Sequence, residues 1–224
     1  MIHIVFEEPE FNIDIFKVEI IWDNDDTENT EMHKNINGVW SAEINELPKG
    51  TYTYRFLING IFTINDYNAN IYEPDDEGKL WSALVIDSEG RRLYNNTQYG
   101  VHIEAVQITD DYYEDIDDSI FEFDSSTSKQ VVVRYEFAKI TGAHTASVLW
   151  INPSGRIKAW SEEIVIPSID KNMLWFGLDT SNIYKEDSGE WNILLFIDGK
   201  YIFSHSFFLK YAGRKAIPSF SVTI

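Results

Sequence analysis

Apolar and polar residues alternate along two similar stretches of the chain. The first is Gly50-Thr-Tyr-Thr-Tyr-Arg-Phe-Leu-Ile-Asn-Gly-Ile-Phe62, and the second, 139 residues later, is Gly189-Glu-Trp-Asn-Ile-Leu-Leu-Phe-Ile-Asp-Gly-Lys-Tyr201. Period-two alternation places every second side chain on one face of a β-sheet. Asn-Gly and Asp-Gly supply the two positive φ values that a type I′ turn needs. Each stretch therefore predicts a β-hairpin.

Short apolar or alternating runs separated by turn residues fill most of the remaining sequence. Beyond the two hairpins, the pattern predicts strands at residues 2–6, 13–22, 38–44, 80–86, 101–108, 119–123, 130–137, 146–151, 156–160 and 173–178. Hardly any segment has the 3.6-residue period of a helix. The fold class predicted is all-β, with two immunoglobulin-like antiparallel β-sandwich domains in tandem.

The boundary between the two domains is predicted where the periodicity breaks, from Asp87 to Gly100. We expect a first sandwich at 1–88, a linker at 89–100, a second sandwich at 101–210 and a basic C-terminal segment at 211–224. That last segment ends in alternating apolar residues. Two interpretations of it stay open, because it can pair as an extra strand against an acidic neighbour or remain a mobile tail.

The composition is typical of a globular protein that folds without disulfide bonds. Its 7 Trp, 12 Tyr and 14 Phe supply enough apolar volume for two cores, and it has no cysteine. The absence of cysteine excludes disulfides and thiolate metal sites and fits a reducing compartment. The first ten residues lack the basic and apolar regions of a signal peptide, and no apolar run approaches the length of a membrane span. We expect a soluble cytoplasmic protein.

The net charge of −19 changes which partners are plausible. Residues 1–90 carry 5 basic and 19 acidic side chains, a balance of −14, and residues 91–224 carry 13 and 18, a balance of −5. Such a field repels phosphate backbones and anionic lipids. The expected partners therefore include no nucleic acid and no membrane surface.

The first hairpin belongs to a longer motif. Gly38-Val-Trp40 is followed by Leu47-Pro-Lys-Gly50 and then by the hairpin itself. Together these residues resemble the glycogen-binding modules of the AMP-activated kinase β subunit and the starch-binding domains of isoamylases and branching enzymes. The resemblance covers about residues 13–87 and implies an early-set immunoglobulin-like fold for the first domain.

The same resemblance implies a carbohydrate site on the first domain. In that family two tryptophans, a basic side chain and an asparagine hold the α-glucan. Arg55 occupies the position of the basic residue and Phe62 that of one tryptophan, whereas Asp23–Thr27 stand where the other tryptophan is expected. The asparagine is replaced at or near Trp81. Three aromatics either rebuild this platform or pack in the core: Trp22, Tyr67 and Trp81.

The second hairpin differs from the first on its outward face. The outward positions of the second hairpin include Leu194 and Phe196, whereas the first hairpin has Thr51, Thr53 and Arg55 on that face. A strand that is apolar on both faces needs cover on both. Either a bulky loop beside a central strand covers these residues, or they form an interface with the first domain or a second subunit. By contrast, the phase of three tryptophans predicts core positions for Trp40, Trp150 and Trp191.

The sequence contains no recognisable catalytic or metal-binding motif. No two of its histidines have the spacing of a metal pair: His3, His33, His102, His144 and His205. The acidic loops 23–26 and 110–118 lack the glycine and distant glutamate of an EF-hand, so solvated loops are the favoured interpretation over calcium sites. Tyr112 and Tyr113 in the second loop are candidate anchors for a basic protein partner. We predict no catalytic residue, no metal and no cofactor.

These observations favour a non-catalytic binding protein that mediates protein–protein contacts. The alternative is α-glucan binding through the first domain, and an enzyme is the third choice. The partner is accordingly a protein or an α-glucan, and self-association into a homo-oligomer is a further expectation.

Overall fold

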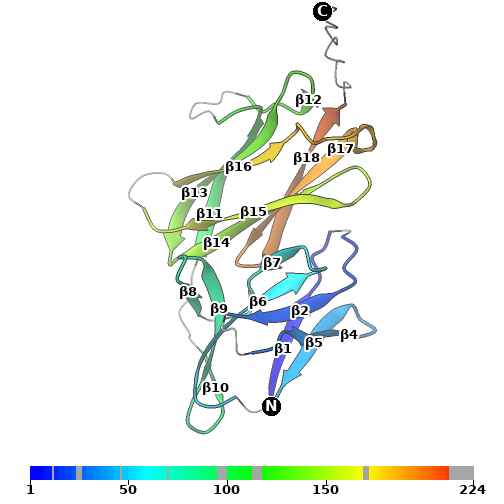
Figure 1. Ribbon diagram of the computed structural model, residues 1–224. Coiled ribbons are helices and arrows are strands. Elements are labelled where there is room, and N and C mark those ends of the chain that lie inside the picture. Colours follow the sequence, from blue (N-terminus) through cyan, green and yellow to red (C-terminus); the bar gives the residue numbers. More distant parts are fainter. Residues whose placement is uncertain are drawn as a thin grey trace, which may run out of the picture.

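The computed structural model describes residues 1–11, 13–23, 27–45, 47–69, 71–94, 100–112, 118–168 and 172–211. It consists almost entirely of strands, which form two β-sandwiches stacked one above the other (Figure 1). Within the described residues a single 3₁₀ turn, η1 (Lys185–Asp187), is the only helical element. The predicted all-β fold class is therefore confirmed.

The N-terminal sandwich contains two sheets. The smaller sheet has the strand order β1-β5-β4, and the larger has the order β10-β9-β6-β2-β3, with β7 paired to β6 and β8 paired to β9. The strands are β1 (Ile2–Glu7), β2 (Val18–Trp22), β3 (Thr30–Glu31), β4 (His33–Lys34), β5 (Val39–Ile44), β6 (Gly50–Ile58), β7 (Phe62–Ile64), β8 (Tyr72–Pro74), β9 (Leu80–Ile86) and β10 (Arg92–Leu93).

The C-terminal sandwich also contains two sheets, ordered β11-β13-β16 and β12-β18-β17-β14-β15. The short strand β12 pairs with β18 in parallel, which modifies the wholly antiparallel arrangement predicted. The strands are β11 (Gly100–Thr109), β12 (Glu122–Asp124), β13 (Gln130–Thr141), β14 (His144–Ile151), β15 (Ile157–Val165), β16 (Asn172–Asp179), β17 (Gly189–Ile197) and β18 (Lys200–Lys210).

The stretch predicted as a linker begins within the N-terminal sandwich. Arg92 and Leu93 form β10 and pair with Ile86 and Val85 of β9. The sequence pattern alone did not reveal this pairing, because a two-residue strand has no measurable period. Residues 95–99, and residues 212–224 of the predicted C-terminal segment, lie outside the described part of the chain.

One turn motif recurs at four strand connections. Its first residue is Asn or Asp and its fourth is Gly, in the segments 35–38, 75–78, 87–90 and 152–155. In each, the side-chain oxygen of the first residue accepts the backbone N–H four residues later, and the glycine has a positive φ. Asn and Asp favour such turns because their short side chains mimic a backbone carbonyl.

The two hairpin turns have the predicted geometry. Asn59 and Gly60 have φ values of 54° and 68°, and Asp198 and Gly199 have φ values of 52° and 83°. Positive φ at both central residues is the signature of a type I′ turn. The prediction of two β-hairpins from their Asn-Gly and Asp-Gly pairs is confirmed.

The core of the N-terminal sandwich extends into the C-terminal one. Its cluster of buried residues includes Leu149 and Ile151 of β14 and Leu194 and Phe196 of β17. These four side chains lie on the outer face of the C-terminal five-stranded sheet, since the intervening residues of both strands belong to the second core. The N-terminal sandwich therefore covers the second apolar face of β17, as one of the sequence-based alternatives proposed.

Polar contacts follow the same interface. The Asn65 side chain is buried and donates hydrogen bonds to Thr145 Oγ1 (2.8 Å) and to the Leu80 carbonyl (3.0 Å). Gly199 lies directly against Asn65, because a Cβ atom built on Gly199 would be 1.8 Å from the Asn65 carbonyl oxygen. The second hairpin thus inserts its turn against the N-terminal sandwich.

This contact predicts different effects for two equivalent glycines. Gly199→Ala and Gly60→Ala both place a Cβ at positive φ, at a cost of about 1–2 kcal/mol. A Cβ on Gly60 meets open space, whereas one on Gly199 meets backbone. We expect Gly199→Ala to lower the free energy of unfolding by about 1–3 kcal/mol more than Gly60→Ala. Urea denaturation measures both; equal losses would contradict the close approach.

The three tryptophans predicted as core residues are buried. Trp40 is 6% exposed, and Trp150 and Trp191 are fully buried. Trp150 and Trp191 both pack against Phe207, with ring centroids 6.1 Å apart in each case. These assignments from strand parity are confirmed.

Candidate functional site

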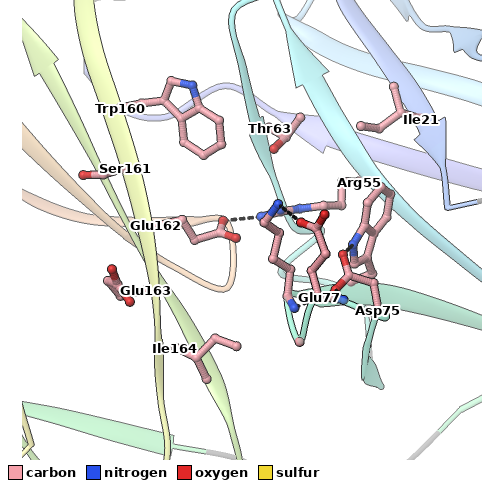
Figure 2. A pocket seen from close by; sticks show the side chains of 13 residues that line it. Ile21, Arg55, Thr63, Asp75, Glu77, Trp160, Ser161, Glu162, Glu163 and Ile164 are labelled. Atoms are coloured by element: carbon pink, nitrogen blue, oxygen red, sulfur yellow. Dashed lines mark hydrogen bonds and ion pairs between the residues drawn. The ribbon is translucent and has the colours of Figure 1, made fainter.

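A groove of about 590 Å³ lies between the two sandwiches, within the usual size range of ligand sites. We call it the inter-sandwich groove. Figure 2 shows β15 with its side chains on one side and side chains of the N-terminal sandwich on the other. Its lining residues are Ile21, Arg55, Thr63, Asp75, Glu77, Gly78, Lys79, Trp81, Trp160, Ser161, Glu162, Glu163 and Ile164.

A buried ion pair crosses the floor of the groove. Arg55 on β6 binds Glu162 on β15, and their side chains are 3% and 10% exposed (Figure 2). Ser147 on β14 donates a second hydrogen bond to the same Glu162 oxygen at 3.1 Å. The Arg55 guanidinium also lies 5.8 Å from the centre of the Trp81 ring, within cation–π range. The ion pair therefore links the N-terminal sandwich to the C-terminal sandwich at the groove.

The loop between β8 and β9 forms the N-terminal wall. Asp75 accepts the Trp81 indole N–H at 2.9 Å and the backbone N–H groups of Glu77 and Lys79 at 2.9 and 2.8 Å. Desolvation of Asp75 opposes its ionisation, but these hydrogen bonds outweigh that cost and hold its pKa below the ordinary 3.8. Asp75 is therefore a carboxylate at neutral pH and fixes the orientation of Trp81.

The opposite wall is an edge strand. Five consecutive residues of β15 line the groove, from Trp160 to Ile164. Successive side chains of a strand point to opposite faces, so a groove lined by all five runs along the edge of the strand. Among the described strands, β15 pairs with β14 on one side only. The other edge presents backbone N–H and C=O groups to the groove.

The groove combines negative charge with an accessible aromatic ring. Four carboxylates, at positions 75, 77, 162 and 163, outnumber two cations, at 55 and 79, giving a formal balance of −2. Trp160 is 37% exposed. Two buried wall atoms, Arg55 Nε and Ser161 Oγ, have no hydrogen-bond partner among the described residues. These features suit a ligand that carries positive charge and offers hydrogen-bonding groups.

The groove contains two of the five residues proposed for carbohydrate binding, Arg55 and Trp81. Phe62 and Trp22 are 2% and 8% exposed and pack in the N-terminal core, so neither ring offers a face to a sugar. This corrects the sequence-based proposal for both: strand parity places them inward. Tyr67 lies in a separate groove of about 310 Å³ and donates a hydrogen bond to Glu7 at 2.8 Å.

The candidates for a protein interface are also divided. Leu194 and Phe196 are 0% and 2% exposed and lie at the contact between the two sandwiches, so they offer no surface to a separate partner. Tyr112 is 53% exposed. Tyr113 lies outside the described residues, as do 24–26 and 114–117 of the two acidic loops.

The described residues contain neither a metal-binding cluster nor a membrane-spanning helix. No three His, Cys, Asp or Glu side chains in that part of the chain are grouped so as to hold a metal ion. No described helix is long and apolar enough to cross a membrane.

The residues that β15 contributes to the groove were not predicted from the sequence. A signal is present in Ile157-Lys-Ala-Trp-Ser-Glu-Glu-Ile-Val165, where polar residues occupy both phases of the strand. Such a strand cannot be covered on either whole face, which is typical of a sheet edge. The pattern gives no indication that Arg55, a hundred residues earlier, is the partner of Glu162.

The sequence matched no known protein family and no curated protein. Among solved structures, an immunoglobulin-like protein from Pseudomonas aeruginosa is 16% identical with a TM-score of 0.37, over 50% of this chain and 97% of its own. A tandem repeat from the extending region of a large adhesion protein is 12% identical with a TM-score of 0.30, over 89% and 43%. A β-glucosidase from Listeria innocua is 9% identical with a TM-score of 0.33, over 54% and 17%.

All three TM-scores lie below 0.5, so these likenesses support no conclusion about the function of this chain. The chain spans less than half the length of the adhesion protein and β-glucosidase chains that it matches. None of the three structures is described as a glycogen-binding module. The described strands form two β-sandwiches in tandem, each built from two sheets.

Proposed function

We propose that this protein is a non-catalytic interaction protein that binds an extended segment of a partner polypeptide in the inter-sandwich groove. The observation that carries the proposal is the free edge of β15, whose residues 160–164 all line the groove. An extended peptide adds to such an edge through main-chain hydrogen bonds, and side-chain pockets beside the edge give specificity.

The chemistry of the groove defines the partner segment. The excess of carboxylates favours lysine or arginine in the segment, and Glu163 is exposed with no ion pair among the described residues. The Trp160 side chain is 37% exposed, so its ring can pack against an apolar or cationic side chain of the partner. Because side chains of the added strand alternate, the expected segment has basic or polar residues on one face and apolar residues on the other.

The hydrogen bonding of Asp75 supports a binding role over catalysis. A carboxylate held ionised by three hydrogen bonds is a poor proton donor near neutral pH. Another partly buried carboxylate of the groove, Glu162, is committed to Arg55. The groove thus offers fixed charges and hydrogen-bond acceptors rather than a group poised to transfer a proton.

Peptide titration tests the proposal. We expect a fluorescein-labelled octapeptide of alternating lysine and valine to bind, with affinity that falls as salt rises. Trp160→Ala should weaken binding by about tenfold or more, whereas Tyr184→Ala, which removes another exposed aromatic ring, should not.

Two control peptides separate charge from strand addition. A glutamate–valine octapeptide keeps the alternation with the opposite charge and should not bind. A lysine–valine peptide with every second backbone nitrogen methylated keeps the charge but loses the ladder donors. If that peptide, in both methylation registers, binds as well as the parent, strand addition is wrong.

Saccharide binding is a second candidate for the same groove. It is favoured by the presence there of Arg55 and Trp81, two residues of the glycogen-binding resemblance, together with Trp160. Aromatic rings stack on apolar sugar faces, and Arg and carboxylates bond to hydroxyls. Maltoheptaose at millimolar concentration should then bind and displace the lysine–valine peptide, and Trp160→Ala should abolish both effects. If calorimetry detects no heat of binding and maltoheptaose does not displace the peptide, the groove does not bind this α-glucan.

A further inference from the structure

We propose that the inter-sandwich groove of one copy binds residues 218–224 of a second copy of this chain, so that the protein assembles head to tail. This inference rests on the proposed function, because it names the polypeptide segment that adds to β15.

The sequence of the C-terminal segment fits the groove. Residues 218–224 read Pro-Ser-Phe-Ser-Val-Thr-Ile, with apolar side chains at Phe220, Val222 and Ile224 and hydroxyl side chains between them. This strict alternation is the pattern of a strand with one apolar face. Arg214 and Lys215 precede it, and the segment contains no acidic residue. The positive charge of these two preceding residues complements the balance of −2 in the groove.

Strand register shows where the groove lies relative to the end of β18. Trp160 is opposite Leu149 on β14, Leu149 is opposite Leu194 on β17, and Leu194 is opposite Ser204 on β18. Trp160 is therefore level with Ser204 and three strand spacings to the side. Tyr211 lies seven residues after Ser204, which is about 23 Å along the strand at ~3.3 Å per residue. Three strand spacings of ~4.8 Å add about 14 Å at right angles, so Tyr211 is about 27 Å from Trp160.

This distance argues against occupation of the groove by the whole of residues 218–224 from the same copy, with Pro218 beside Trp160. Pro218 reaches at most about 25 Å from Tyr211, even through a fully extended chain. The straight line to Trp160 passes through the sheet, so any real path is longer. Glu163, which is level with Lys200 through Ala146 and Ile197, is farther still. The segment of a second copy has no such restriction.

The assembly that results has a defined symmetry. The groove lies between the two sandwiches, whereas β18 ends at the far end of the C-terminal sandwich (Figure 1). Donor and acceptor are different surfaces, so the contact is heterologous and generates a ring or an open chain rather than a closed two-fold dimer. Because the contact pairs opposite charges near the surface, it weakens as ionic strength rises.

A mixing experiment with two full-length variants tests the inference. The groove variant carries Trp160→Ala and Glu163→Lys and keeps its C-terminal segment. The tail variant carries Phe220→Ser and Val222→Ser and keeps its groove. Light scattering after size exclusion should show concentration-dependent oligomers for the unmodified protein and monomers for each variant alone.

The mixture gives the sharper readout. In the mixture, the intact C-terminal segment of the groove variant can bind the intact groove of the tail variant. A 1:1 heterodimer should therefore form, and it should not grow further because its remaining groove and C-terminal segment are both altered. A monomeric unmodified protein at all accessible concentrations, or oligomers that persist in the groove variant, would overturn the inference. Far-ultraviolet circular dichroism of each variant confirms that a monomeric result does not come from unfolding.

Synthetic peptides separate this inference from the proposed function. A peptide of residues 210–224 should bind the tail variant and lose about tenfold or more in affinity for the groove variant. A scrambled peptide of the same composition should not bind. If the lysine–valine octapeptide binds but the 210–224 peptide does not, the groove binds some other segment and the inference fails alone. If neither binds, both proposals fail.

Discussion

Phe196→Ala is expected to lower the free energy of unfolding by about 3–5 kcal/mol, the usual cost of truncating a buried phenylalanine. Phe196 is 2% exposed and belongs to the core that the two sandwiches share. Its ring packs against Tyr201, with centroids 5.8 Å apart. The substitution leaves a cavity between two rigid sheets, which cannot both collapse into it. Urea denaturation followed by tryptophan fluorescence measures the loss.

The matched control for this substitution is Phe16→Ala. Phe16 is 69% exposed, so the same atoms are removed where they contact water. Phe16→Ala should change the free energy of unfolding by no more than about 0.5 kcal/mol, as is usual for surface substitutions. If Phe196→Ala instead left stability unchanged and altered only the oligomeric state, Phe196 would belong to a subunit interface and the described packing would be wrong.

The second large effect is expected at the ion pair between the sandwiches. Arg55→Ala leaves the carboxylate of Glu162 buried without its cation, and breaking a buried pair from one side costs about 3–5 kcal/mol. The double substitution Arg55→Met with Glu162→Leu removes both charges and refills the space. It should be neutral or more stable than the unmodified protein by about 1–4 kcal/mol. Urea denaturation of the single and double variants measures the coupling.

An exposed ion pair provides the comparison. Lys79 binds Glu77 at 2.7 Å, but their side chains are 58% and 74% exposed. Lys79→Ala should therefore change stability little, because water and salt screen such pairs. A loss for Arg55→Ala no larger than that for Lys79→Ala would show that the floor of the groove is open to solvent and that the pair does not hold the sandwiches together.

Together these two substitutions test whether the sandwiches unfold as one unit. Phe196 supplies apolar contact and Arg55 supplies charge to the same interface. If the interface is as extensive as the buried residues indicate, both variants should unfold in a single transition at lower urea. Separate transitions for the two sandwiches in either variant would show that the interface had been lost while each fold persisted.

Local patterns in the sequence were sufficient to predict most of the longer strands and the fold class. The alternation in 50–58 and 189–197 and the Asn59-Gly60 and Asp198-Gly199 pairs specify hairpins without reference to any distant residue. Periodicity and turn geometry are properties of a few adjacent residues, which is why the sequence reveals them. The shortest strands, such as β10, lacked a period and were missed.

Inward and outward positions could be predicted only in part. Trp150 and Trp191 are in phase with apolar neighbours and are buried, as parity indicates. Phe62 was assigned to a sugar surface from a motif, although its inward position between Ile58 and Ile64 in the hairpin made burial equally compatible. A motif preserves framework residues along with binding residues, so a match does not separate them.

By itself, the sequence determined most of the longer strands, where the hairpins turn, that β17 needs cover on both faces, and that the chain carries a strong negative charge. Only the tertiary structure decided that the N-terminal sandwich supplies that cover, that Arg55 pairs with Glu162, and that residues 160–164 border a groove. The physical reason is the separation along the chain of the residues that determine each feature. Strand period and turn geometry act between neighbouring residues, whereas the groove depends on how two finished sandwiches pack, which no local pattern encodes.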